Sequence, residues 1–138
     1  KRLVVVDDSI VRGTTSRQII ALLREAGATE VHFRVSSPPY RWPCFYGLDT
    51  GKRSDLLAAD MEIGEIALYL GVDSLAYLDL DHLVAATESP REAFCTACFT
   101  GEYPVPVPEY DTKHVLESES RTIHVQGTIS GSASAERA

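Results

Sequence analysis

Two adjacent carboxylates and a short hydroxyl-rich loop form the part of this sequence best suited to chemistry. Residues 5–16 read VVDDSIVRGTTS, at a point where an apolar strand should end and a helix begin. Gly13 lets the backbone turn tightly, and Thr14 and Thr15 bring hydroxyl groups beside the free N–H groups of the helix start. Because parallel sheets bind ligands at the carboxyl ends of their strands, this loop can cradle a phosphate monoester.

The carboxylates suggest what the phosphate is attached to. Asp7 and Asp8 can accept hydrogen bonds from neighbouring sugar hydroxyls or hold Mg²⁺, so the pattern fits a ribose 5-phosphate. The Gly-Lys-Ser/Thr element of a nucleotide triphosphate loop is missing. Taken alone, the two acids could be a solvated turn and the Thr-Thr-Ser run a simple helix cap.

Three cysteines form the second candidate site. Cys95 and Cys98 make a CxxC, and Cys44 lies earlier in the chain. The spacing allows a redox pair, half a zinc site completed by His32 or His82, part of an iron–sulfur cluster, or free thiols. A thioredoxin-like pair is disfavoured, because this CxxC precedes Phe-Thr-Gly and a proline run instead of opening a helix after a strand.

The hydrophobic pattern predicts an α/β domain that positions the phosphate loop. Residues 3–6 form an apolar run typical of a strand buried on both faces of a parallel sheet, followed by a helix at 15–26 and a strand at 31–35. The later chain is predicted to hold a proline-rich loop at 36–53, a helix at 54–59 capped by Ser54, helices at 62–70 and 79–87, a strand at 74–78, and an extended run at 104–108.

The other polar and aromatic residues are interpreted as structural. We expect Arg17, Arg24 and Glu25 to be solvated on the first helix, and His32 to be packed in its strand. Residues 79–88 supply charges at helix ends. The aromatic side chains of the proline-rich loop are expected to pack around the cysteine segment instead of stacking on a base; they are Tyr40, Trp42, Phe45 and Tyr46.

Composition limits the classes of function. The 138 residues carry 13 Lys and Arg against 20 Asp and Glu, a net charge of −7, and 44% are hydrophobic. This balance fits one globular domain and argues against nucleic acid or an anionic membrane as partner. No apolar run reaches the ~18 residues of a spanning helix. Three cysteines are too few for a disulfide framework, which favours the cytoplasm.

Several strings, in order, resemble the amidophosphoribosyltransferase family of purine biosynthesis. Besides DDSIVRGTTS they are LREAGA, SSPP, PCFYGLDT, GVDSL and CTACFTG. The resemblance implies the C-terminal portion of a type I phosphoribosyltransferase fold: half of that domain at 1–88, a cluster-ligand segment at 89–108 and a disordered tail at 109–138. It also implies a pentosyltransferase that makes 5-phosphoribosylamine from phosphoribosyl pyrophosphate (PRPP) and glutamine-derived ammonia.

The resemblance also implies particular site residues. It assigns the PRPP contacts to Asp7, Asp8, Ser9, Arg12, Gly13, Thr14 and Thr15. It assigns Mg²⁺ to Asp7 and Asp8, and a 4Fe–4S cluster to Cys44, Cys95 and Cys98. Purine nucleotide inhibitors and a homotetramer follow from the same likeness.

The sequence departs from the whole family pattern. It begins with Lys1, so we expect a fragment that lacks the glutaminase domain with its cysteine nucleophile, the upstream half of the transferase fold and a fourth cluster cysteine. Alone it should show no glutaminase and little transferase activity. Two alternatives share the loop at residues 7–15: a purine-salvage phosphoribosyltransferase and a non-enzymatic PRPP-sensing regulator.

Overall fold

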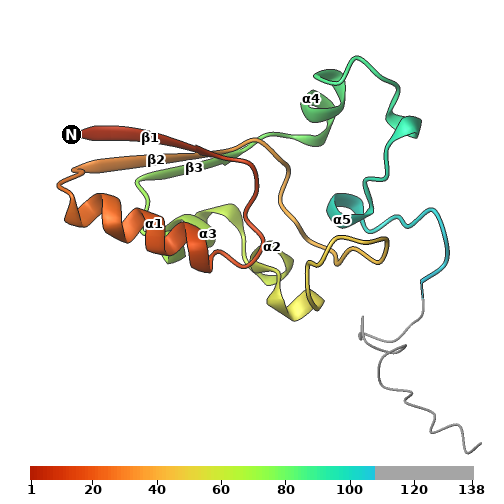
Figure 1. Ribbon diagram of the computed structural model, residues 1–138, viewed down its shortest axis with the longest axis horizontal. Helices are drawn as coiled ribbons and strands as arrows, with labels where there is room; N and C mark the ends of the chain where they lie inside the picture. Colours follow the sequence, from red (N-terminus) through yellow and green to blue (C-terminus); the bar gives the residue numbers. More distant parts are fainter. Residues whose placement is uncertain (108–138) are drawn as a thin grey trace, which may run out of the picture.

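A three-stranded parallel sheet organises the protein, whose computed structural model describes residues 1–107 (Figure 1). The strands are β1 (Arg2–Asp7), β2 (Glu30–Val35) and β3 (Ser74–Tyr77), in the order β1-β2-β3. Val5 pairs with Phe33, which pairs with Leu75. The three predicted strands are therefore confirmed, each within one residue at either end.

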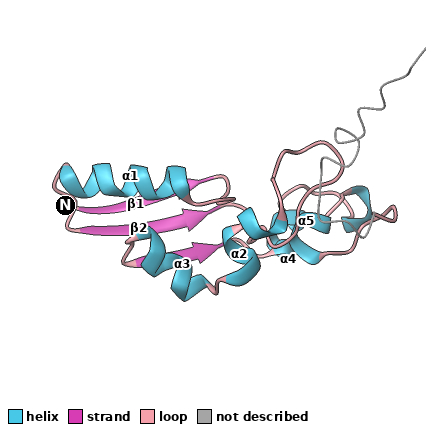
Figure 2. Cartoon of the chain, turned by 90° about the horizontal axis from the view of Figure 1, so that it is seen from below, coloured by secondary structure: helices cyan, strands magenta, loops and turns pink. Residues whose placement is uncertain are grey.

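Two helices cover one face of this sheet. Helix α1 (Thr14–Glu25) connects β1 to β2, and helix α3 (Ile63–Leu70) precedes β3; Figures 1 and 2 place both on the same side. Between them and the strands lies the core, made of Ile10, Ile20, Val31, Phe33, Val35, Ala58, Ile66 and Leu70. The alternation of buried and half-buried residues along β2 shows that one face of that strand supplies the core.

The opposite face of β1 is open, which corrects the prediction that this strand is buried on both sides. Val4 is 67% exposed and Val6 71% exposed, whereas Val5 packs against the core. Parallel strands usually have helices on both faces. Within residues 1–107 the helices packed on the sheet lie on one face, so alternate valines of β1 remain accessible.

The remaining elements are short. They are η1 (Arg53–Asp55), α2 (Leu57–Asp60), α4 (Leu80–Ala85), η2 (Arg91–Ala93) and α5 (Ala97–Thr100). Ser54 does not cap a helix as predicted, because it lies inside the 3-10 turn η1 and α2 begins after Leu56. By contrast, Asp79 caps α4 by accepting the N–H of His82, as expected of a helix-end charge.

Helix α3 shows why its bounds could be predicted from sequence. Glu62 and Glu65 form a reciprocal capping box at its start, which satisfies N–H groups that the first turn leaves unpaired. Gly71 ends the helix at φ 76°, a left-handed conformation that favours glycine. Local sequence signals therefore define both ends.

Arg24 is structural, contrary to the expectation of a solvated side chain. Its guanidinium lies 2.6 Å from the Asp73 carboxylate and donates to the carbonyls of Thr29 and Gly71. Asp73 also accepts the N–H of Val31 at 2.7 Å. This network ties the end of α1 to the starts of β2 and β3. Arg17 is partnered as well, since its guanidinium lies 5.0 Å from the ring centroid of Tyr69.

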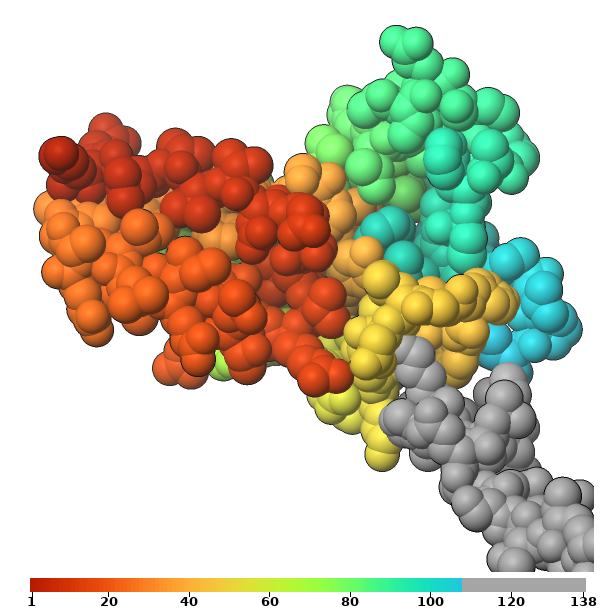
Figure 3. Space-filling view, viewed as in Figure 1, coloured from red at the N-terminus to blue at the C-terminus, as the bar shows by residue number. Residues whose placement is uncertain are grey.

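A second lobe lies beyond the carboxyl ends of the strands, as the space-filling view shows (Figure 3). The loop after β2 meets the segment around α5 there: the N–H groups of Arg41 and Trp42 both donate to the carbonyl of Cys98. The predicted disordered tail at 109–138 lies outside the described residues. Within residues 1–107, no helix is long and apolar enough to cross a membrane.

The Asp73 network predicts a pH-dependent loss of stability. The hydrogen bond from Val31 and then the Arg24 guanidinium hold the pKa of Asp73 below its ordinary value of 3.8. Its contribution is therefore present above that value and lost as pH falls through the lower folded-state pKa. Asp73→Ala should lower the melting temperature at pH 7, and the difference from wild type should shrink towards pH 3.

Asp60→Ala, which changes an exposed carboxylate in α2, is the matched control. Thermal unfolding of both variants at pH 7 and pH 3 measures the effect. An Asp73→Ala deficit of the same size at both pH values would contradict the ionic role.

Candidate functional site

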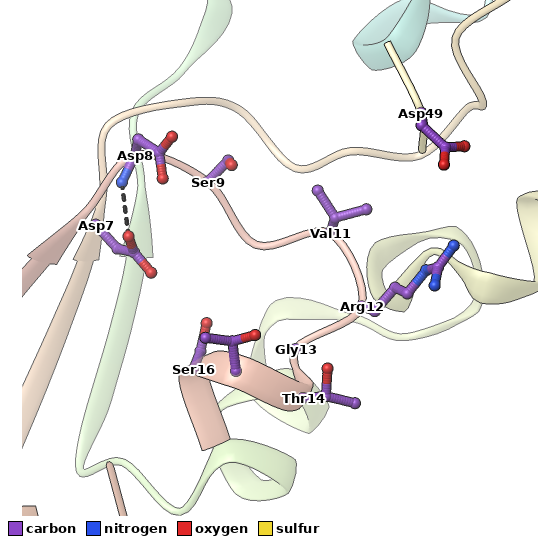
Figure 4. A pocket seen from close by; sticks show the side chains of 10 residues that line it. Asp7, Asp8, Ser9, Val11, Arg12, Gly13, Thr14, Ser16 and Asp49 are labelled. Carbon is purple, nitrogen blue, oxygen red and sulfur yellow. Dashed lines mark hydrogen bonds between the residues drawn. The ribbon is translucent and has the colours of Figure 1, made fainter. Parts of the chain in front are cut away.

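A pocket of about 470 Å³ lies at the carboxyl end of β1, where the chain turns into α1 (Figure 4). It is lined by Asp7, Asp8, Ser9, Val11, Arg12, Gly13, Thr14, Thr15, Ser16 and Asp49. The structure thus brings together all seven residues predicted to contact PRPP. The location matches the expectation for a parallel sheet, whose ligands bind at the carboxyl ends of strands.

Gly13 sets the path of the loop. It is the N-cap of α1 with φ 71°, a left-handed conformation that costs other residues strain energy. A Cβ atom there would lie 2.7 Å from Cδ2 of Leu57 and 3.2 Å from Cε1 of Tyr69. Both conformation and space therefore require glycine, and the close approach of α2 and α3 was not visible in the sequence.

The carboxylates are held at the mouth of the pocket by backbone hydrogen bonds. The N–H of Asp8 donates to Oδ1 of Asp7 at 3.0 Å, as Figure 4 shows. The carbonyl of Asp7 accepts the N–H of Ser36, which follows β2. Asp7 is half-buried and Asp8 exposed. Two acceptor side chains at a strand end can take hydroxyl donors or a hard cation.

The opposite part of the pocket favours an anion. The first turn of α1 carries no acidic residue, so the N–H groups and positive end of the helix dipole face the pocket uncompensated. Thr14 and Thr15 add exposed hydroxyls, while Ser16 is only 4% exposed. Nη2 of Arg12 lies 4.0 Å from Asp55 on a half-exposed surface, so its charge is partly balanced.

Asp49 was not among the predicted site residues. It arrives from the loop after β2 and lies across the pocket from the turn into α1 (Figure 4). Its string, PCFYGLDT, entered only through the resemblance. No periodicity or spacing near Asp49 indicates that it meets residues 7–16, because that meeting depends on how the loop folds back.

The three cysteines approach one another in the second lobe. Burial raises the pKa of Cys98 to about 11, with smaller contributions from Cys44 and Cys95. Burial and the same three thiols also raise the pKa of Tyr103, whose hydroxyl donates to the carbonyl of Pro43 at 2.7 Å. All three are free cysteines. The fold therefore brings together thiols that are distant in sequence.

The metal chemistry of the thiols is not decided by their positions alone. Among residues 1–107, no three His, Cys, Asp or Glu side chains are already arranged around a common metal position. The two histidines considered for zinc have other partners: His32 contacts Ser74 and Glu30, and His82 contacts Asp79. His32 is thus the packed strand residue that was predicted.

The CxxC partly departs from its predicted loop conformation. A single helical turn, α5, begins at Ala97 and includes Cys98. It follows the turn η2 and an irregular stretch, so the predicted absence of a preceding strand is confirmed, but the absence of any helix is wrong. The cause is local, since Gly101 at φ 81° can end one turn of helix before the prolines.

The aromatic residues pack as predicted, between the proline-rich loop and the cysteine segment. Tyr40 meets Phe99 edge-on with centroids 5.0 Å apart, and Phe45 meets Tyr103 at 5.3 Å. The indole of Trp42 lies under the Arg53 guanidinium at 4.2 Å and against Gly101. These rings fill the lobe and leave no base-stacking platform among themselves.

A parallel α/β sheet with this strand–loop–helix pocket defines the type I phosphoribosyltransferase fold class. No family model matches the sequence, but individual proteins do. Amidophosphoribosyltransferase of Synechocystis is 52% identical over 88% of this chain, and amidophosphoribosyltransferase 2 of Arabidopsis thaliana is 54% identical over 76%. The chain spans about a quarter or less of their length.

Solved structures agree. The glutamine PRPP amidotransferase of B. subtilis complexed with ADP and GMP matches with a TM-score of 0.73 and 46% identity, over 80% of this chain and 25% of the other. A structure of the allosteric regulatory enzyme of purine biosynthesis gives a TM-score of 0.74. This chain therefore corresponds, in sequence and in fold, to about a quarter of an amidophosphoribosyltransferase.

The geometry at Gly13 predicts the effect of adding one methyl group. Gly13→Ala should destabilise the protein by more than the ~1–2 kcal/mol expected for a left-handed alanine, because the new Cβ also meets Leu57. Gly27→Ala is a matched control, since Gly27 has φ 92° but nothing within 4 Å of the position that a Cβ would take. Urea unfolding of both variants tests this, and equal losses would show that space at Gly13 is not limiting.

Proposed function

We propose that this chain supplies the ribose 5-phosphate site of an amidophosphoribosyltransferase, which forms 5-phosphoribosylamine from PRPP and glutamine-derived ammonia. The observation that carries the proposal is the pocket at the start of α1, where two carboxylates stand beside an uncompensated helix N-terminus. The relatives' names support the reaction. The pocket supports the part of it that this chain performs.

The loop at residues 12–15 would bind the 5-phosphate. Backbone N–H groups at the start of α1 donate to the phosphate oxygens, and the hydroxyls of Thr14 and Thr15 add further donors. Arg12 supplies positive charge at the rim, and Ser9 supports the turn. Anchoring a phosphate remote from the reacting carbon uses binding energy to orient that carbon.

Asp7 and Asp8 would hold the ribose. Their carboxylates accept hydrogen bonds from vicinal hydroxyls and can ligate Mg²⁺. When bound, Mg²⁺ neutralises charge on the departing pyrophosphate. The carboxylates themselves place negative charge near a sugar ring that becomes cationic as ammonia replaces pyrophosphate at C1, which favours that transition state.

The cysteine lobe would hold a structural 4Fe–4S cluster. Cys44, Cys95 and Cys98 are proposed as three of its thiolate ligands, with a fourth from another segment of the enzyme. Thiolates are the usual ligands of such clusters, and the three thiols already influence one another's ionisation. Free cysteines also suit a reducing compartment, which supports a cytoplasmic enzyme.

Regulation and assembly are proposed from the relatives. The related B. subtilis structure contains ADP and GMP, so we infer that purine nucleotides inhibit the enzyme containing this chain. A homotetramer is proposed on the family resemblance. Neither nucleic acid nor a membrane is proposed as partner, in line with the net charge of −7.

Binding of ribose 5-phosphate tests the proposed site directly. We expect this chain to bind ribose 5-phosphate at least about tenfold more tightly than ribose, because charged hydrogen bonds contribute ~1.5–3 kcal/mol. Thr15→Val should weaken binding about tenfold. Thr87→Val, which alters an exposed threonine in the stretch after α4, should leave it unchanged. Calorimetric titration measures both, and equal affinities for the sugar with and without phosphate would exclude the proposal.

Anaerobic reconstitution with iron and sulfide tests the cluster. In a polypeptide extended to include the fourth ligand, a brown chromophore should form and should be lost in Cys44→Ser, Cys95→Ser and Cys98→Ser. Thr96→Ala, which lies between the two CxxC thiols, should retain it. A chromophore that survives any one of the serine variants would remove that cysteine from the ligand set.

A further inference from the structure

The loop at residues 47–51 connects the cysteine lobe to the phosphate pocket. At its centre Thr50 is 1% exposed, and its hydroxyl accepts the N–H of Cys44 at 2.8 Å. The N–H of Thr50 in turn donates to the carbonyl of Leu48. A buried threonine with this bond fixes the loop against the backbone that carries the first cysteine.

The residues on either side of Thr50 reach the pocket. Asp49 lines its wall (Figure 4). Gly51 presses on the rim: a Cβ there would lie 2.6 Å from Nη2 of Arg12 and 2.7 Å from Oδ2 of Asp55. A shift of Thr50 would therefore displace one pocket residue directly and disturb the Arg12–Asp55 pair on its other side.

The contact continues into the phosphate loop. Downstream of Gly51, the N–H of Leu57 donates to the carbonyl of Val11 at 2.9 Å, and the side chain of Leu57 closes over Gly13. Residues 50–57 thus touch the phosphate loop at three successive residues, 11 to 13. The segment is short, which limits how far one end can move without the other.

We propose that Thr50 is a positioning residue that couples the cysteine segment to the phosphate pocket. Ligand binding at the pocket restrains residues 49–51 and, through Thr50, the backbone of Cys44. The effect is reciprocal, because coupling between two sites acts equally in both directions. The identity of the ligand rests on the proposed function, whereas the mechanical connection does not.

A ligand-free experiment tests the connection by itself. Thr50→Val keeps the shape of the side chain but leaves the Cys44 N–H without its acceptor, whereas Thr50→Ser keeps a hydroxyl. Hydrogen exchange in this chain should become roughly tenfold faster at the Cys44 and Leu57 amides in Thr50→Val and return towards wild type in Thr50→Ser. The Asp73 amide, bonded to Val31 in the sheet, is the internal control. Faster exchange at Cys44 without any change at Leu57 would overturn the proposal.

A second experiment adds the ligand. Alkylation by iodoacetamide, mapped by peptide mass spectrometry, should slow several-fold at Cys44 when ribose 5-phosphate is present. Cys95 is exposed and serves as the reference thiol in the same molecule. The protection should disappear in Thr50→Val, persist in Thr87→Val and be restored in Thr50→Ser, and ribose 5-phosphate should bind Thr50→Val more weakly.

The outcomes separate the two proposals. If ribose 5-phosphate fails to bind wild-type protein but Thr50→Val still loosens both amides, the coupling stands and the assignment of the pocket falls. If the ligand binds and Cys44 is protected equally in wild type and Thr50→Val, the pocket stands and the role of Thr50 is excluded. Weaker ligand binding with no serine rescue would also exclude it, since a hydroxyl is required.

Discussion

The turn from β1 into α1 is the constraint on which the rest of the structure depends. The chain must reverse direction at Gly13 in a space closed by Leu57 and Tyr69, so residues from two later helices decide the shape of a loop formed early in the chain. Once that turn is set, the start of α1 faces the carboxyl edge of the sheet. The pocket therefore requires α2 and α3 as much as its own loop.

The pocket also explains how an acidic chain could hold an anion. The positive field is local: it comes from backbone N–H groups at a helix start without acidic neighbours, and Arg12 adds a charge that Asp55 partly balances. Asp7, Asp8 and Asp49 leave the other walls negative. A ligand with a phosphate at one end and hydroxyl donors at the other matches both halves, which is the charge pattern of a ribose 5-phosphate.

The cysteine lobe is held differently, mainly by aromatic rings and side chain–backbone bonds. Tyr40, Tyr46 and Tyr103 join the proline-rich loop to the segment after α4 through ring contacts and hydroxyl bonds. Prolines leave few N–H groups for regular structure, so packing and isolated hydrogen bonds replace it. The hydroxyl of Thr50 is one of these bonds, and it is the one placed where the lobe meets the pocket.

The sequence by itself determined the order and type of the main elements, the phosphate loop and the cysteine pattern, because periodicity, capping residues and glycine stops act over a few neighbouring residues. Only the tertiary structure decided the contacts between distant segments: the bridge from Arg24 to Asp73, the position of Asp49 and the burial of Thr50. The valines of β1 show the boundary most clearly. An apolar run states that a strand can be covered on both faces, but whether a covering layer is there depends on which other segments pack against it, and in residues 1–107 the helices on the sheet pack against one face.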